Sequence, residues 1–108
     1  MNKFEVVIIL SPEIGTQTLK EEIDFFKKQI SNNTGKIIND EDWGLRDLSY
    51  NINKFKKAFY CFFQIEIDSK NIDKIKKNLN QADNFLRHLF IKVNTHQELP
   101  TKIFNEKK

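Results

Sequence analysis

The spacing of hydrophobic positions predicts four strands and two helices. Strands are expected at Lys3–Leu10, from Lys36 to Ile52, at Ala58–Ile67 and at Phe85–Val93, where apolar residues alternate or run together. Helices are expected over about residues 18–33 and from Ser69 to about residue 82. Each carries an apolar stripe at spacings of three and four: Leu19, Ile23, Phe26 and Ile30, then Ile72, Ile75, Leu79 and Ala82. This β-α-β-β-α-β order predicts an α+β, ferredoxin-like fold, a four-stranded antiparallel sheet with two helices on one face.

Residues at the element ends carry more local signals. Thr18 and Glu21 have capping-box spacing at the start of the first helix. Gly35 suits the left-handed residue that ends this helix. Ser69 is the expected N-cap of the second helix. The length of the second strand predicts a bulge or bend near Gly44.

The sheet has too many apolar residues for a single buried face. Two helices cover one side, so the other side of an isolated domain is expected to be polar. Strand alternation instead places six hydrophobic residues there: Val7, Ile9, Tyr60, Phe62, Leu89 and Ile91. We expect these residues to bind a protein partner. Two alternatives stay open: the C-terminal tail folds across them, or single exposed apolar residues carry no meaning.

Length and composition indicate one domain, residues 1–94, followed by a polar tail, residues 95–108. The first apolar run is too short to span a membrane and lacks a signal-peptide cleavage site. A lone cysteine, Cys61, makes no internal disulfide and suits a reducing compartment.

The net charge of +3 is unevenly distributed. There are 6 basic and 9 acidic residues up to Asp47, but 12 basic and 6 acidic residues from Leu48 onward. The basic half is a candidate surface for a polyanion, although solvated surface lysines would give the same count. The candidate RNA-binding residues are Arg46, Lys54, Lys56, Lys57, Arg87 and Lys92.

Catalytic and metal-binding signals are weak, so we expect no enzyme, metal or other cofactor. Alternation puts Asp40 and Asp42 on one side of a strand, where two exposed carboxylates make a poor metal site. His88 and His96 lack other ligands at zinc spacing, and we expect the ring of His88 to be packed or partly buried. We interpret Cys61 as a small core residue, because no nearby base is indicated that could activate its thiol as a nucleophile. The sequence has no glycine-rich phosphate loop.

A general RNA-recognition module is one alternative. Residues 57–63 loosely match the motif on its third strand. However, Ala58 replaces the motif's glycine, and the aromatic alternation is imperfect. Base stacking on the open sheet is therefore less convincing than protein contact.

The segment Trp43–Asn53 carries the most specific pattern: a glycine, any residue, a basic residue, a polar residue, Leu, Ser or Ala, Tyr, any residue and Ile. In this pattern the chain resembles the bacterial ribosomal protein S6 family. Further similarities are Lys54, residues 57–60, residues 4–6, and Asp83-Asn84 before a last strand that contains Arg87. The resemblance covers roughly residues 3–94.

The resemblance implies a ferredoxin-like protein without enzymatic activity. It implies binding to the central domain of small-subunit, 16S-type ribosomal RNA together with ribosomal protein S18. By carry-over, Arg46 and Lys54 are the best RNA-contacting candidates, whereas Tyr50 and Ile52 are structural. The implied location is the ribosome of the cytoplasm or of an organelle matrix, with no membrane and no small-molecule substrate. The alternatives are a stand-alone RNA-recognition-like module and a small-molecule-binding regulatory domain.

Overall fold

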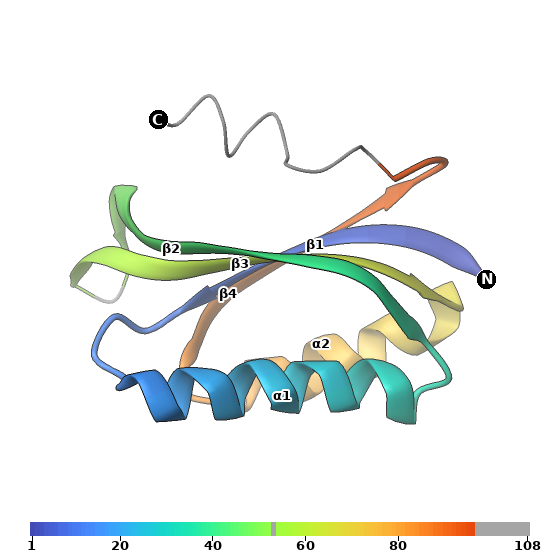
Figure 1. Cartoon of the computed structure of the whole chain (residues 1–108), viewed down its shortest axis with the longest axis horizontal. Coiled ribbons are helices and arrows are strands. Elements are labelled where there is room, and N and C mark those ends of the chain that lie inside the picture. The colour runs from blue at the N-terminus through green and yellow to red at the C-terminus, as the bar shows by residue number, and fades with distance from the viewer. Residues whose placement is uncertain (53, 97–108) are drawn as a thin grey trace.

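A four-stranded antiparallel sheet forms one layer of the computed structural model, and two helices form the other (Figure 1). The structure describes residues 1–52 and 54–96, with only the backbone at residues 49 and 50. The strand order is β2-β3-β1-β4, and both helices lie on one face, which confirms the predicted ferredoxin-like fold. The elements are β1 (Asn2–Leu10), α1 (Thr16–Asn32), β2 (Lys36–Ile52), β3 (Phe55–Ile67), α2 (Ile72–Asn80) and β4 (Phe85–Val93).

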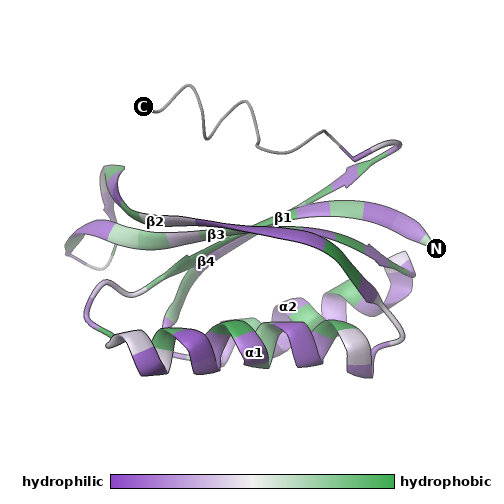
Figure 2. Ribbon diagram, in the orientation of Figure 1, coloured by the Kyte–Doolittle hydropathy of each residue, from purple (hydrophilic) through white to green (hydrophobic). Residues whose placement is uncertain are grey.

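The core lies between the sheet and the helices. β1 pairs with β3 on one side and with β4 on the other, so its inward residues lie at the centre of the core. The apolar sides of α1 and α2 face the sheet (Figure 2), as their periodicity predicted. Fully buried side chains come from every layer: Val6, Ile8, Leu10, Phe26, Ile30, Ile65, Ile67, Ile75 and Leu79. Burying a large apolar side chain stabilises by roughly 1.5–3 kcal/mol, so this cluster is the main source of stability.

The predicted irregularity of the second strand is confirmed. The register of β2 against β3 shifts between Asp42 and Gly44, because Asp42 pairs with Cys61 and Gly44 pairs with the adjacent Tyr60. Trp43 is therefore the extra residue of a bulge. Gly44 has φ +72°, a conformation that glycine adopts without a steric penalty.

The expected ends of the first helix were wrong. α1 begins at Thr16 with Gly15 as its N-cap, and no side chain caps it, so the Thr18 capping box does not form. The Gly15 carbonyl instead accepts a hydrogen bond from the Leu19 amide at 2.9 Å. Thr34, with φ 63°, is the left-handed residue after the helix, rather than Gly35. Gly35 is required for space, since a Cβ there would lie 2.8 Å from Ile30 Cγ2.

The start of the second helix also differs from the prediction. Asp68, rather than Ser69, caps a short 3-10 turn by accepting a hydrogen bond from the Lys70 amide at 3.2 Å. The Ser69 hydroxyl instead donates to Asn2 Oδ1 at 2.7 Å, which ties this turn to the start of β1. Ala82 packs against the core beyond the end of α2.

β4 has the predicted limits, whereas β3 begins three residues earlier than expected, at Phe55. The predicted tail begins at residue 95, and its residues 97–108 lie outside the described residues. No helix of the described part is long and apolar enough to cross a membrane.

Candidate partner and nucleic-acid interface

The sheet face opposite the helices carries the six predicted partner residues. In the strand register, Val7 lies between Phe62 and Leu89, and Ile9 pairs with Tyr60, so these side chains share the open face. Leu89 is 55% exposed and Ile91 is 48% exposed. Val7, Ile9 and Tyr60 are half-buried. An exposed apolar patch of this kind is typical of an interaction surface.

Phe62 is the most enclosed of the six predicted partner residues. It lies on the open face but is only 3% exposed. The Trp43 ring stacks against it with centroids 5.5 Å apart, and against Tyr60 at 6.3 Å. Trp43 follows Asp42, which lies on the helix side, so alternation along β2 places the Trp43 side chain on the open face, and the bulge keeps the next residue, Gly44, on that side too. Trp43 is therefore a site residue that the sequence analysis missed, although it stands beside the predicted bulge.

A polar cluster interrupts the open face beside these rings. Gln64 Nε2 donates a hydrogen bond to Glu5 Oε2 at 2.9 Å, and Asn39 Nδ2 donates to Gln64 Oε1 at 3.3 Å. His96 Nδ1 lies 3.6 Å from the same Glu5 oxygen. Glu5 and Gln64 are both buried, and buried polar groups require such partners. The sequence analysis assigned no role to Glu5 or Gln64, although both polar positions follow from strand alternation.

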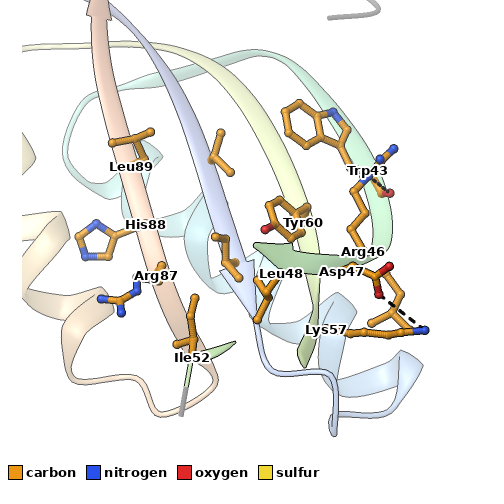
Figure 3. Close-up of a pocket in the computed structure, with 13 residues that line it drawn as sticks. Trp43, Arg46, Asp47, Leu48, Ile52, Lys57, Tyr60, Arg87, His88 and Leu89 are labelled. Atoms are coloured by element: carbon orange, nitrogen blue, oxygen red, sulfur yellow. Dashed lines mark hydrogen bonds and ion pairs between the residues drawn. The ribbon is translucent and has the colours of Figure 1, made fainter. Parts of the chain in front are cut away.

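A groove of about 910 Å³ opens beside this surface (Figure 3). Its lining includes apolar side chains from all four strands: Val7, Ile9, Leu45, Leu48, Ile52, Tyr60 and Leu89. Arg46 and Lys57 lie at the rim formed by β2 and β3, and Arg87 lies on β4. The groove thus combines an apolar lining with three cations.

The strands position these cations differently. Arg46 Nε donates to the Trp43 carbonyl at 3.0 Å, which ties the guanidinium group to the bulge. Lys57 lies 3.9 Å from Asp47 in an exposed ion pair, which stabilises little. Lys54 and Lys56 are exposed beside them, with Lys54 in the turn between β2 and β3.

Arg87 and Lys92 do not lie together. Arg87 pairs with Ile9 and faces the open side. Lys92 pairs with Phe4, on the opposite side and toward the other end of β4. The structure therefore gathers five of the six candidate cations at the end of the sheet that carries the β2–β3 turn, and leaves Lys92 apart. It does not test which of them bind RNA.

The titratable groups of the sheet do not form a catalytic centre in the described part of the chain. Burial, with Asp42 and Asp40 nearby, raises the pKa of Cys61 to about 12, so its thiol stays protonated at neutral pH. Burial, and the charge of Lys76, lower the pKa of His88, whose Nε2 lies 2.9 Å from Asn80 Oδ1. Burial also raises the pKa of Tyr60, an effect that Arg46 opposes.

The acidic run on β2 is engaged in local contacts. Asp40 forms an ion pair with Lys27 at 3.0 Å, and Asp42 Oδ1 accepts a hydrogen bond from the Gly44 amide at 2.8 Å. Asp40 and Asp42 share the helix side, as alternation predicted. Among the described residues, no group of three or more His, Cys, Asp or Glu side chains could hold a metal ion.

An apolar groove with Arg46, Lys57 and Arg87 among its lining residues is typical of a macromolecule-binding surface. Comparisons with known proteins specify the family. Residues 3–92 match the family described as "Ribosomal protein S6". The chain therefore belongs to the ribosomal protein S6 family, whose members are structural components of the small ribosomal subunit and not enzymes.

Individual relatives agree with this assignment. The chain is 35% identical over 107 residues to the small ribosomal subunit protein bS6 of Pelagibacter ubique, covering 99% of this chain and 88% of the relative. It is 33% identical over 96 residues to the bS6 protein of Bacteroides thetaiotaomicron, covering 89% and 84%. The crystal structure of 30S ribosomal protein S6 from Thermotoga maritima superposes with a TM-score of 0.82, covering 85% of this chain and 87% of that one. At 22% identity, that similarity supports the fold alone.

Proposed function

We propose that this protein binds small-subunit, 16S-type ribosomal RNA together with ribosomal protein S18. The cation-bearing end of the sheet contacts RNA, and the apolar open face contacts S18. The observation that carries the proposal is their adjacency, because Arg46, Lys57 and Arg87 line the same groove as Val7, Ile9 and Leu89. RNA and a protein bound to these two parts would therefore touch each other.

Charge supports the RNA side of the proposal. Lys54 and Lys56 are exposed and form no ion pair within the described residues. Cations of this kind neutralise phosphates and set affinity without reading base sequence. The proposed RNA contacts are Arg46, Lys54, Lys56, Lys57 and Arg87, with Lys92 as an outlying candidate.

Exposed apolar surface supports the protein side. Leu89 and Ile91 are large hydrophobic side chains beside the half-buried Val7 and Ile9. Protein interfaces combine such an apolar centre with a polar rim. The proposed S18 contacts are Val7, Ile9, Tyr60, Leu89 and Ile91, with Phe62 as a buried residue of the same face that packs against Trp43.

The stand-alone RNA-recognition module is less well supported. Such modules stack bases on aromatic rings of the open sheet. Here the Trp43 and Phe62 rings stack on each other at an interplanar angle of 8°. The Phe62 face that a base would need is therefore occupied.

A binding assay with three components tests the proposal. A labelled RNA fragment of the small-subunit central domain is titrated with this protein, with S18, and with both. We expect the pair to bind more tightly and at lower concentration than either protein alone. Equal binding with and without S18 would refute the joint mechanism, and failure of the pair to bind would refute the RNA assignment.

A further inference from the structure

A buried carboxylate lies within the open face that the proposed function assigns to S18. Glu5 is only 8% exposed and stands on β1, an inner strand of the sheet, two residues before Val7. Its strand neighbours are Gln64 on β3 and the exposed Ile91 on β4. A protein that covered Ile91 would therefore also remove the remaining water from Glu5.

Hydrogen bonds hold this carboxylate in place. The buried Gln64 donates to Glu5 Oε2 at 2.9 Å, and Asn39 donates in turn to Gln64 Oε1 at 3.3 Å. A carboxylate fixed in this way loses little freedom when it binds a further group. Amide donors carry no charge, so Gln64 and Asn39 do not balance the negative charge of Glu5. Burial of an ionised carboxylate is costly unless a cation pairs with it.

The His96 ring lies against this carboxylate but makes a poor contact with it. His96 Nδ1 is 3.6 Å from Glu5 Oε2, which is beyond the length of a hydrogen bond. Both ring nitrogens of His96 are buried, and neither has a hydrogen-bond partner within the described part of the chain. Polar atoms buried in this state weaken the contact that holds them. Residue 96 follows the bend at residues 94 and 95 and belongs to no strand, so its ring can move without breaking the sheet.

We propose that Glu5 anchors an arginine side chain of S18, which replaces His96 against the carboxylate when the two proteins bind. Arginine fits this position because its guanidinium group donates two parallel hydrogen bonds to a carboxylate and is more weakly hydrated than the ammonium group of lysine. Protein interfaces are correspondingly enriched in arginine and depleted of lysine. This role of Glu5 rests on the proposed function and deepens it, because one position of the apolar face then selects a partner with a positive charge.

The charges of the open face orient such a partner. Glu5 and Ile9 are four strand residues apart, about 13 Å, and Ile9 pairs with Arg87 at the groove. The groove cations Arg46, Lys57 and Arg87 would repel a positively charged side chain of the partner. The arginine of S18 therefore docks at the Glu5 end of the face, and the cation-bearing end stays available to RNA.

The kinetics of binding to purified, immobilised S18 test the anchor. Glu5→Gln removes the charge but keeps the shape of the side chain and an oxygen that accepts the Gln64 hydrogen bond. We expect this variant to dissociate about tenfold faster with nearly unchanged association, because loss of a buried charge pair acts on dissociation. The matched control is Glu21→Gln, the same change at an exposed position of α1, which is expected to alter neither rate. Equal dissociation of Glu5→Gln and the wild type, both folded by circular dichroism, would overturn the anchor.

His96→Ala tests whether the imidazole ring gives way to the partner. We expect this variant to bind S18 as tightly as the wild type or up to about threefold more tightly, because no ring has to be displaced. A loss of affinity as large as that of Glu5→Gln would make His96 itself the cation of the pair and would overturn the proposal. If the wild type did not bind S18 at all, the proposed function would fail and the anchor with it, whereas binding that Glu5→Gln leaves intact would overturn the anchor alone.

Discussion

Neutralising the lysines beside the β2–β3 turn is expected to change the salt dependence of RNA binding. Lys54, Lys56 and Lys57 are exposed, and among the described residues only Lys57 of these three forms an ion pair, with Asp47 at 3.9 Å. Replacing all three with Gln removes the charge and keeps much of each side chain. If two of them contact phosphates, the slope of log affinity against log salt falls by about 1.8, which is roughly 60-fold in affinity at 0.1 M salt.

The assay is a titration of the central-domain RNA fragment with the S18 complex between 0.05 and about 0.3 M salt, the range over which counterion release is measurable. A matched control replaces Lys20, Lys28 and Lys74, exposed residues of the helix layer, with Gln. The control loses the same charge but is expected to keep the wild-type slope within about 0.5. An unchanged slope in the β2–β3 variant would place the RNA contacts elsewhere, and equal losses in both variants would indicate non-specific attraction.

Three further predictions concern the sheet. Phe62→Ala and Phe63→Ala are each expected to lower the free energy of unfolding by about 3–5 kcal/mol in urea titrations, because both rings are buried. If Phe62→Ala lowered it by less than about 1 kcal/mol, the enclosure of this ring by Trp43 would be contradicted. Replacing both Leu89 and Ile91 with Ser is expected to change the free energy of unfolding by about 1 kcal/mol or less, because both side chains are exposed. The same variant is expected to bind S18 at least tenfold more weakly, which is about 1.4 kcal/mol. Unaltered binding of S18 would show that these residues are not in the interface. Burial lowers the pKa of His88 below its ordinary 6.5 in the folded state, so the stability contributed by the neutral ring is fully present above pH 6.5 and is lost as the pH falls through the folded-state pKa. His88→Gln is therefore expected to make the decline of the unfolding free energy with falling pH shallower in urea titrations. The same decline in both proteins would refute this prediction.

Hydrophobic periodicity predicted the fold because burial dominates its energetics. The inward residues of β1 and β3 and the stripes of both helices lie in the core where alternation placed them. The helix ends were less predictable, since several groups compete for each terminal amide. At α1 the Gly15 backbone serves as the N-cap without a side chain, and at the following 3-10 turn Asp68 replaces Ser69.

The candidate site was predictable as a face but not in detail. Alternation assigned Val7, Leu89 and Ile91 to the open side correctly. It did not reveal that the Trp43 ring stacks on Phe62 and encloses it, because alternation gives the face of a side chain but not the neighbour on which it packs. The position of Arg46 and Arg87 along one groove depends on strand order and became visible only in the fold.

Sedimentation with ribosomal subunits tests the central claim most directly. The tagged protein is expressed at its normal level, and the lysate is separated on a sucrose gradient with subunits dissociated. We expect the protein to travel with the small subunit and to move to the top of the gradient after nuclease treatment. Its recovery only as free protein before that treatment would contradict the proposed role in the small ribosomal subunit.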